Sequence, residues 1–194
     1  MKVLTLAIIL AAPAVHAEPV SYRIDSSHSS VQFSIRHLMV ANVRGEFSKV
    51  SGSLVWDAVN PEKSSVTAVI DVTTINTREA KRDADLKGPD FFDTAKYPEA
   101  KFVSKRVSRS GDDLLVVGDL TMRGAVHEVT LTASVPPAEV KDARGNFKTG
   151  TTATGKLSRK KWGIVYNPAL ETGGVVIGDE VTLTIDIEAV KVVK

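Results

Sequence analysis

The feature that most constrains the fold is an alternation of residue types with a period of two, which recurs along most of the chain. In residues 29–37, the apolar side chains of Val31, Phe33 and Ile35 alternate with polar ones. This period is typical of a half-buried β-strand. Further segments with the same character predict strands at residues 52–56, 66–72, 101–107, 114–120, 129–135, 153–157 and 181–189.

Short turn signals separate these segments. They are Asn60-Pro61, Gly111-Asp112, Arg123-Gly124, Arg144-Gly145-Asn146 and Gly173-Gly174. About eight strands joined by short turns predict an all-β antiparallel barrel or sandwich. Small residues at inward positions, such as Ala68, Gly118, Ala133 and Ala153, favour an internal cavity. The alternative is a solid core filled by Phe33, Trp56, Phe102 and Trp162.

One segment near residues 78–88 breaks the alternation and predicts a short helix. Thr77 is the candidate N-cap, and Gly88-Pro89 ends the helix. Carboxylates and basic residues alternate along it, with Asp83 and Lys87 spaced as an i,i+4 pair. We interpret this mixture as a solvated helix face rather than as a catalytic carboxylate pair.

The first 17 residues have the pattern of a secretory signal. Lys2 precedes an apolar run over residues 3–12, and small residues lead up to Ala17. The run is too short to span a bilayer, which takes about 20 apolar residues. We therefore expect residues 1–17 to be a cleaved signal peptide and residues 18–194 to be an exported, periplasmic domain without stable membrane insertion.

Composition and motifs exclude several kinds of site. The chain has 194 residues and no cysteine, which excludes disulfides and thiolate metal sites. Lys and Arg number 25 against 23 for Asp and Glu, a balance that argues against a nucleic-acid partner. No Gly-x-Ser-x-Gly elbow or phosphate-binding glycine loop occurs. His28, His37 and His127 lie apart without metal-ligand spacing, so we expect no metal, no cofactor and no catalytic residue.

Two polar residues are candidates for the ends of a cavity. His37 has inward parity at a strand end, where a structural hydrogen bond is the alternative role. Arg159 precedes Trp162 in a basic stretch, and its guanidinium could hold an anionic head group. A solubilising turn in which Arg159 stacks on Trp162 explains the same residues equally well.

An ordered set of short motifs resembles the YceI-like family of exported polyisoprenoid-binding proteins. The motifs are Ile24-Asp25, His28-Ser29, Gly45, Phe47, Gly52, Ile75-Asn76-Thr77, Arg82-Asp83-Ala84-Asp85-Leu86-Lys87, Asp90-Phe91-Phe92-Asp93, Tyr97-Pro98, Gly118-Asp119-Leu120-Thr121, Gly124, Arg159, Trp162-Gly163-Ile164 and Gly178-Asp179. The chain departs from the family at Asp85, where a histidine is usual, at Ala125-Val126-His127, and at Trp162, where phenylalanine is commoner. The Asp85 change argues against shared chemistry by that histidine.

The resemblance implies an eight-stranded lipocalin-like barrel that binds a long isoprenoid, such as a polyprenyl phosphate or a quinone-like lipid, in an apolar tunnel. It implies a binding protein for transport, storage or stress protection rather than an enzyme. Strand parity and the resemblance together predict the ligand-binding residues Phe33, Ile35, His37, Leu54, Trp56, Ile70, Phe91, Phe92, Phe102, Leu120, Leu157, Arg159, Trp162 and Ile185.

Three alternatives stay open at this point. An enzyme acting on the bound lipid would need titratable groups converging on the cavity. A solid-core β protein would act through an exposed apolar patch instead. A homodimer is compatible with the sequence, as is a monomer.

Overall fold

A computed structural model describes residues 18–168 and 175–193, so the predicted signal peptide (1–17) and the predicted Gly173-Gly174 turn lie outside the described residues. The strands are β1 Val20–Ile24, β2 Ser30–His37, β3 Ala41–Phe47, β4 Val50–Trp56, β5 Ser65–Asp71, β6 Ile75–Asn76, β7 Glu99–Ser110, β8 Asp113–Met122, β9 Ala125–Ser134, β10 Val140–Lys141, β11 Phe147–Ser158 and β12 Ile177–Lys191. Three 3₁₀ turns, at Pro61–Lys63, Val72–Thr74 and Arg159–Trp162, and the helix α1 (Ala80–Lys87) complete the fold.

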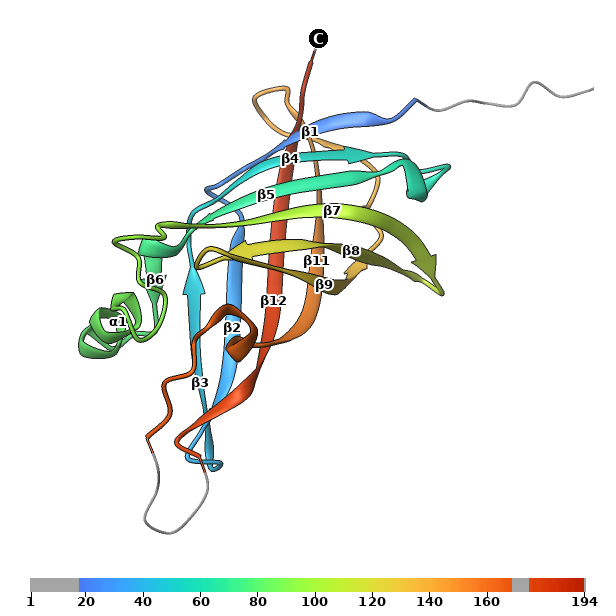
Figure 1. Cartoon of the computed structure of the whole chain (residues 1–194). Coiled ribbons are helices and arrows are strands. Elements are labelled where there is room, and N and C mark those ends of the chain that lie inside the picture. The colour runs from blue at the N-terminus through green and yellow to red at the C-terminus, as the bar shows by residue number, and fades with distance from the viewer. Residues whose placement is uncertain (1–17, 169–174, 194) are drawn as a thin grey trace, which may run out of the picture.

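Eight antiparallel strands close into a barrel, which confirms the predicted fold class. Around the ring the order is β11, β9, β8, β7, β5, β4, β1 and β12, and the pairing of β12 with β11 completes the circle. Closure gives each ring strand a neighbour on both sides, although β11 is only partly paired with β9. Figure 1 shows β4, β5, β7 and β8 side by side, with β11 and β12 crossing behind them.

The long strand β12 joins the barrel to a side extension. One side of β12 pairs with β11 along residues 180–190. Its other side pairs with β2 in its first part and with β1 at its end. The hairpin of β2 and β3 therefore leaves the ring and projects from one end of the barrel (Figure 1).

The sequence predicted the number of ring strands correctly but not every member. The predicted strand at residues 29–37 is β2, which belongs to the extension, whereas β1 closes the ring and was not predicted. A register shift between Ser104 and Arg106 also changes the parity of β7. As a result Phe102 and Val107, five positions apart, both lie in the core.

The predicted helix is present, with a different N-cap. Glu79, not Thr77, accepts hydrogen bonds from the amides at the start of α1 (Ala80–Lys87). Thr77 donates its amide and hydroxyl hydrogens to Asp83. The Asp83 carboxylate therefore binds the loop that precedes the helix, instead of forming the predicted pair with Lys87. The helix has no buried residue and lies outside the barrel wall, as predicted for a solvated helix (Figure 1). Within the described residues, no helix combines the length and the apolar character that crossing a bilayer requires.

Candidate functional site

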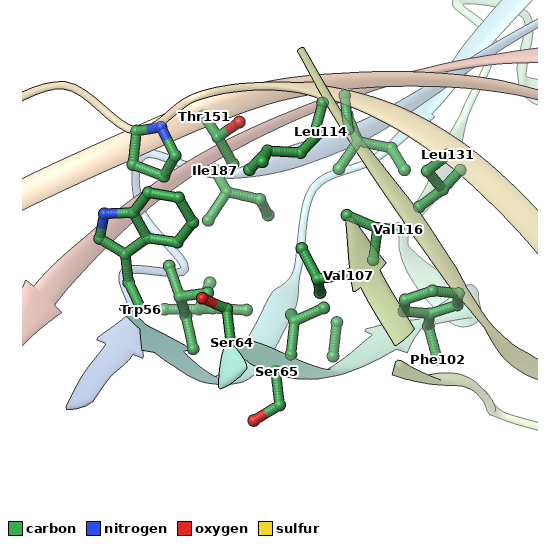
Figure 2. Close-up of a pocket in the computed structure, with 18 of the residues that line it drawn as sticks. Trp56, Ser64, Ser65, Phe102, Val107, Leu114, Val116, Leu131, Thr151 and Ile187 are labelled. Atoms are coloured by element: carbon green, nitrogen blue, oxygen red, sulfur yellow. The ribbon is translucent and has the colours of Figure 1, made fainter. Parts of the chain in front are cut away.

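An apolar cavity of about 120 Å³ lies inside the barrel. Figure 2 shows Thr151, Leu114 and Ile187 on one side of it, Trp56, Ser64 and Ser65 on the other, and Phe102 at one end. All eight ring strands contribute to the wall, and β2 adds Val31. The lining residues are Ile24, Val31, Val50, Leu54, Trp56, Ser64, Ser65, Val66, Ala68, Ile70, Phe102, Val107, Leu114, Val116, Leu131, Ala133, Ser134, Pro136, Thr151, Ala153, Ile185 and Ile187.

Small side chains create this space, as the sequence suggested for Ala68, Ala133 and Ala153, all of which line the cavity. The inward glycines act differently. A Cβ at Gly118 would lie 2.5 Å from the ring of Phe102. The phenyl ring therefore fills the space that a side chain at this position would occupy. The cavity therefore occupies one end of the barrel, and Phe102 forms its floor.

Two of the polar side chains in the wall, Ser64 and Thr151, are engaged in hydrogen bonds within the protein. Ser64 Oγ accepts from the Asp57 amide at 3.0 Å, and Thr151 Oγ1 donates to the Ser134 carbonyl at 2.7 Å. None of the lining residues is an acid, a base or a tyrosine. The wall therefore offers a ligand apolar contact and no acid–base group.

A window interrupts the barrel wall beside the cavity. Strand β11 pairs with β9 only over Ala153–Gly155 and with β10 only over Phe147–Lys148. Residues 149–152 between them lack a neighbouring strand on that side because Pro136 and Pro137, which have no amide hydrogen, interrupt the opposite segment. Side chains bridge the gap instead, with Thr149 Oγ1 donating to the Pro137 carbonyl at 3.0 Å.

The segment 135–139 crosses this window, and we call it the strap. Its anchor is Glu139, which accepts a hydrogen bond from the Tyr22 hydroxyl at 2.7 Å and one from Lys191 Nζ at 3.0 Å. These two contacts lower the pKa of Glu139, the Tyr22 bond contributing most. Burial and the same carboxylate raise the pKa of Tyr22 well above its ordinary value, so the phenol stays a donor.

Five of the predicted ligand-binding residues line the cavity, and they are Leu54, Trp56, Ile70, Phe102 and Ile185. The other predicted residues do not, and they are Phe33, Ile35, His37, Phe91, Phe92, Leu120, Leu157, Arg159 and Trp162. Ligand contact by any of them stays a prediction.

Arg159 and Trp162 close the opposite end of the barrel. Trp162 is 2% exposed, and its indole nitrogen donates to the Leu120 carbonyl at 3.1 Å. Arg159 is 4% exposed, whereas the two interpretations of the sequence placed it at the mouth of a cavity or in a solubilising turn. Its guanidinium donates to the backbone carbonyls of Gly178, Ile164, Tyr166 and Ile177. The guanidinium therefore holds the loop that follows Trp162 against the start of β12.

Aromatic packing and a second arginine complete this closed end. The ring of Phe47 lies 5.7 Å from Phe33 and 5.5 Å from Phe92, measured between centroids. Arg123 donates to the carbonyls of Gly163 and Pro89, both at 2.5 Å. The turn between β8 and β9 is thereby connected to the loop that follows Trp162 and to the loop that follows α1.

One group among the described residues could offer three ligand atoms to a metal ion. His28 Nδ1 lies 3.1 Å from Asp25 and 3.6 Å from Glu188. The Lys148 ammonium lies 2.6 Å from Glu188 and 3.4 Å from Asp25, so a cation of the chain already pairs with both carboxylates. Hydrogen bonds from Ser27 and His28 lower the pKa of Asp25. The arrangement is an ion-pair network beside the window.

The solid-core alternative predicts an exposed apolar patch and no cavity. The cavity is present, and an apolar turn is present as well. Leu38, Met39 and Val40 form the tip of the β2–β3 hairpin and are 40%, 56% and 77% exposed. Leu38 and Met39 both have positive φ, a conformation that favours Asn and Gly in two-residue hairpins.

Several cavity residues were missed by the sequence analysis. Val107, Leu114, Val116, Leu131 and Ile187 line the cavity but were not among the predicted binding residues. Each of the last four lies in a predicted strand, an even number of positions from a residue that was predicted to face inward, namely Leu120, Ala133 or Ile185. The alternation of residue types therefore already indicated that they face the cavity. Pro136 and Thr151 come from the window, which no pattern of period two reveals.

Known proteins resemble this chain over most of its length. The model of the YceI-like domain matches residues 22–189. A UPF0312 protein of Staphylococcus aureus strain USA300 is 38% identical over 83% of this chain and 92% of its own. The crystal structure of the Campylobacter jejuni YCEI protein is similar with a TM-score of 0.67, at 25% identity and full coverage of both chains.

Two further solved structures share the fold at lower identity. Burkholderia cenocepacia BcnA has a TM-score of 0.72, with 21% identity over 85% of this chain and 98% of its own. A polyisoprenoid binding domain from Saccharophagus degradans has a TM-score of 0.64, with 16% identity over 89% of this chain and 99% of its own.

Proposed function

The chain belongs to the YceI-like family, and on this premise we propose that it is an exported, periplasmic binding protein that holds the apolar chain of an isoprenoid lipid inside its barrel. The observation that carries the proposal is the closed barrel with an apolar cavity whose lining has no acid–base group. The similar Saccharophagus degradans domain, described as polyisoprenoid binding, supports the choice of ligand. Binding is the step that transport, storage and stress protection would share.

The size of the cavity defines how a ligand is held. An apolar cavity of roughly 150 Å³ binds benzene, so about 120 Å³ holds roughly one five-carbon isoprene unit. At about 0.8 kcal/mol for each buried CH₂, one unit contributes about 4 kcal/mol. A longer chain has to displace side chains at the Phe102 floor or leave through the window. The strap and the floor are the two places where the barrel would adapt.

Filling the cavity tests the proposal. Ala133 is buried and lines the cavity, whereas its neighbour Thr132 on β9 faces solvent. Ala133→Leu adds three carbons to the cavity and should abolish ligand binding while the barrel stays folded. Thr132→Leu makes a comparable substitution on the outside of the same strand and should leave binding unchanged.

Native mass spectrometry of each variant, purified from its own exported fraction beside an organic extract, provides the measurement. We expect a stoichiometric isoprenoid adduct on the natural protein and on Thr132→Leu, and none on Ala133→Leu. An empty natural protein that also takes up no added prenol would contradict the proposal.

A further inference from the structure

The apolar cavity adjoins a groove on the surface at the window. This groove, of about 580 Å³, shares Ser134, Thr151 and Ile187 with the cavity. A ligand with its apolar chain in the cavity therefore has its polar end at the groove. This step rests on the proposed function, and it makes the groove a candidate site for the head group.

Carboxylates dominate the lining of this groove. Asp142, Asp186 and Glu188 line it. Asp25 lies beside the groove, where Lys148 pairs with both Asp25 and Glu188. Hydrogen bonds from Asn146 lower the pKa of Asp142, so this carboxylate is ionised at neutral pH. The acidic groups therefore outnumber the cations among the described residues of the groove.

The cations of the groove are not free to receive an anion. Lys148 Nζ lies 2.6 Å from Glu188 and 3.4 Å from Asp25, in competition with any phosphate. His28 is within 3.1 Å of Asp25 and so faces the same acidic network. A phosphate monoester carries a charge of about −1.5 to −2 at pH 7, and like charges brought together at an interface cost several kcal/mol.

We propose that the groove is a head-group site that accepts uncharged or cationic groups, such as a hydroxyl, a carbonyl or an amine, and discriminates against phosphate. The acidic rim attracts an amine. The hydroxyls of Ser134 and Thr151, which meet at 3.2 Å at the boundary between groove and cavity, suit a hydroxyl or a carbonyl. Of the two lipid classes that the family resemblance implies, the groove favours the quinone-like one over the polyprenyl phosphate.

Three ligands with the same ten-carbon chain test this proposal, namely geraniol, geranylamine and geranyl monophosphate. Equilibrium dialysis against the natural protein should give a Kd for geranyl monophosphate at least tenfold weaker than that for geraniol, with geranylamine no weaker than geraniol. Higher salt should narrow the difference, because screening weakens the repulsion.

A double variant provides the matched test. Asp186→Asn with Glu188→Gln removes two charges from the rim with little change of shape, and it leaves Asp25 as the one carboxylate among the described residues that pairs with Lys148. Phosphate binding should improve about tenfold while geraniol binding stays the same. The control is Glu180→Gln, which removes one carboxylate charge on β12 at a residue outside the groove and should leave the binding of all three ligands unchanged.

The outcomes separate the two proposals. If geranyl monophosphate binds as tightly as geraniol at low salt, the head-group proposal is overturned and the proposed lipid binding stands. If none of the three ligands binds, both are overturned. Should the double variant fail to fold, the salt dependence measured on the natural protein decides, since a constant ratio of the two Kd values would overturn the head-group proposal.

Discussion

The two ends of the barrel differ in how their hydrogen bonds are buried. At the closed end, Trp162 and Arg159 are buried and donate to backbone carbonyls, so the end is held by hydrogen bonds shielded from water. At the window end, the strap is held by fewer contacts, and its anchor is the Glu139 carboxylate, whose side chain is 25% exposed although its partner Tyr22 is buried. Buried groups cannot exchange their partners for water without a large penalty, whereas partly exposed ones can. The comparison predicts that the window end yields before the closed end does.

The largest effect should come from the closed end, with Arg159→Met. The substitution removes the donor to four backbone carbonyls, and unsatisfied buried acceptors cost about 1–3 kcal/mol each, although partial hydration lowers the total. We expect the free energy of unfolding in urea to fall by about 4 kcal/mol. Lys160→Met, at the next residue, is the control, because Lys160 is 47% exposed and should change the value by less than about 1 kcal/mol.

The outcome has a direct meaning for the comparison. A loss below about 1 kcal/mol for Arg159→Met would show that the closed end is no more firmly held than the window. An equal loss of unfolding free energy in Arg159→Met and Lys160→Met would show that the loss comes from removing a positive charge and not from removing a buried donor.

The positions of the strands could be predicted from the sequence, but their pairing could not. Strand positions follow from the period of two, because each ring strand buries one face. β1 carries the same signal in Val20, Tyr22 and Ile24 and could have been found. Its pairing partners could not, because closure of the ring depends on residues about 170 positions away, as in Tyr22 with Lys191.

The site was less predictable than the fold. Parity placed Leu54 and Ile70 in the cavity, where local alternation suffices. Arg159 was uncertain from sequence because its acceptors are carbonyls contributed partly by β12, which no spacing reveals. The window was also hidden, since it depends on where β9 and β10 stop pairing with β11.

An intermediate effect should come from the strap, through Glu139→Gln and pH. The pKa of Glu139 is lowered in the folded protein, so its contribution to stability is present above the ordinary glutamate pKa of about 4.3 and is lost as the pH falls through the folded value. At pH 7 we expect Glu139→Gln to reduce the free energy of unfolding by about 1 kcal/mol. At pH 3 the difference from the natural protein should shrink.

Urea unfolding at the two pH values, with Glu180→Gln as control, measures this effect. Glu180 is 63% exposed and pairs with Lys156 at the surface, so its variant should show a smaller difference at both pH values. Hydrogen exchange at Val140 and Lys141 should also become faster in Glu139→Gln, because β10 follows the strap. An unchanged exchange rate would mean that the strap is held by other contacts and that the two ends differ less than we infer.

The smallest effect should come from His28→Ala. The side chain is 59% exposed and touches Asp25 and Glu188 at the outer rim, and exposed ion pairs contribute about 0–1 kcal/mol. Both stability and geraniol binding should therefore stay close to those of the natural protein, since the imidazole faces the groove and not the cavity. Equilibrium dialysis and urea unfolding measure the two quantities. A tenfold loss of geraniol binding in a folded His28→Ala protein would place ligand chemistry at the Asp25, His28 and Glu188 network, and the window would then be more than a passage to an apolar cavity.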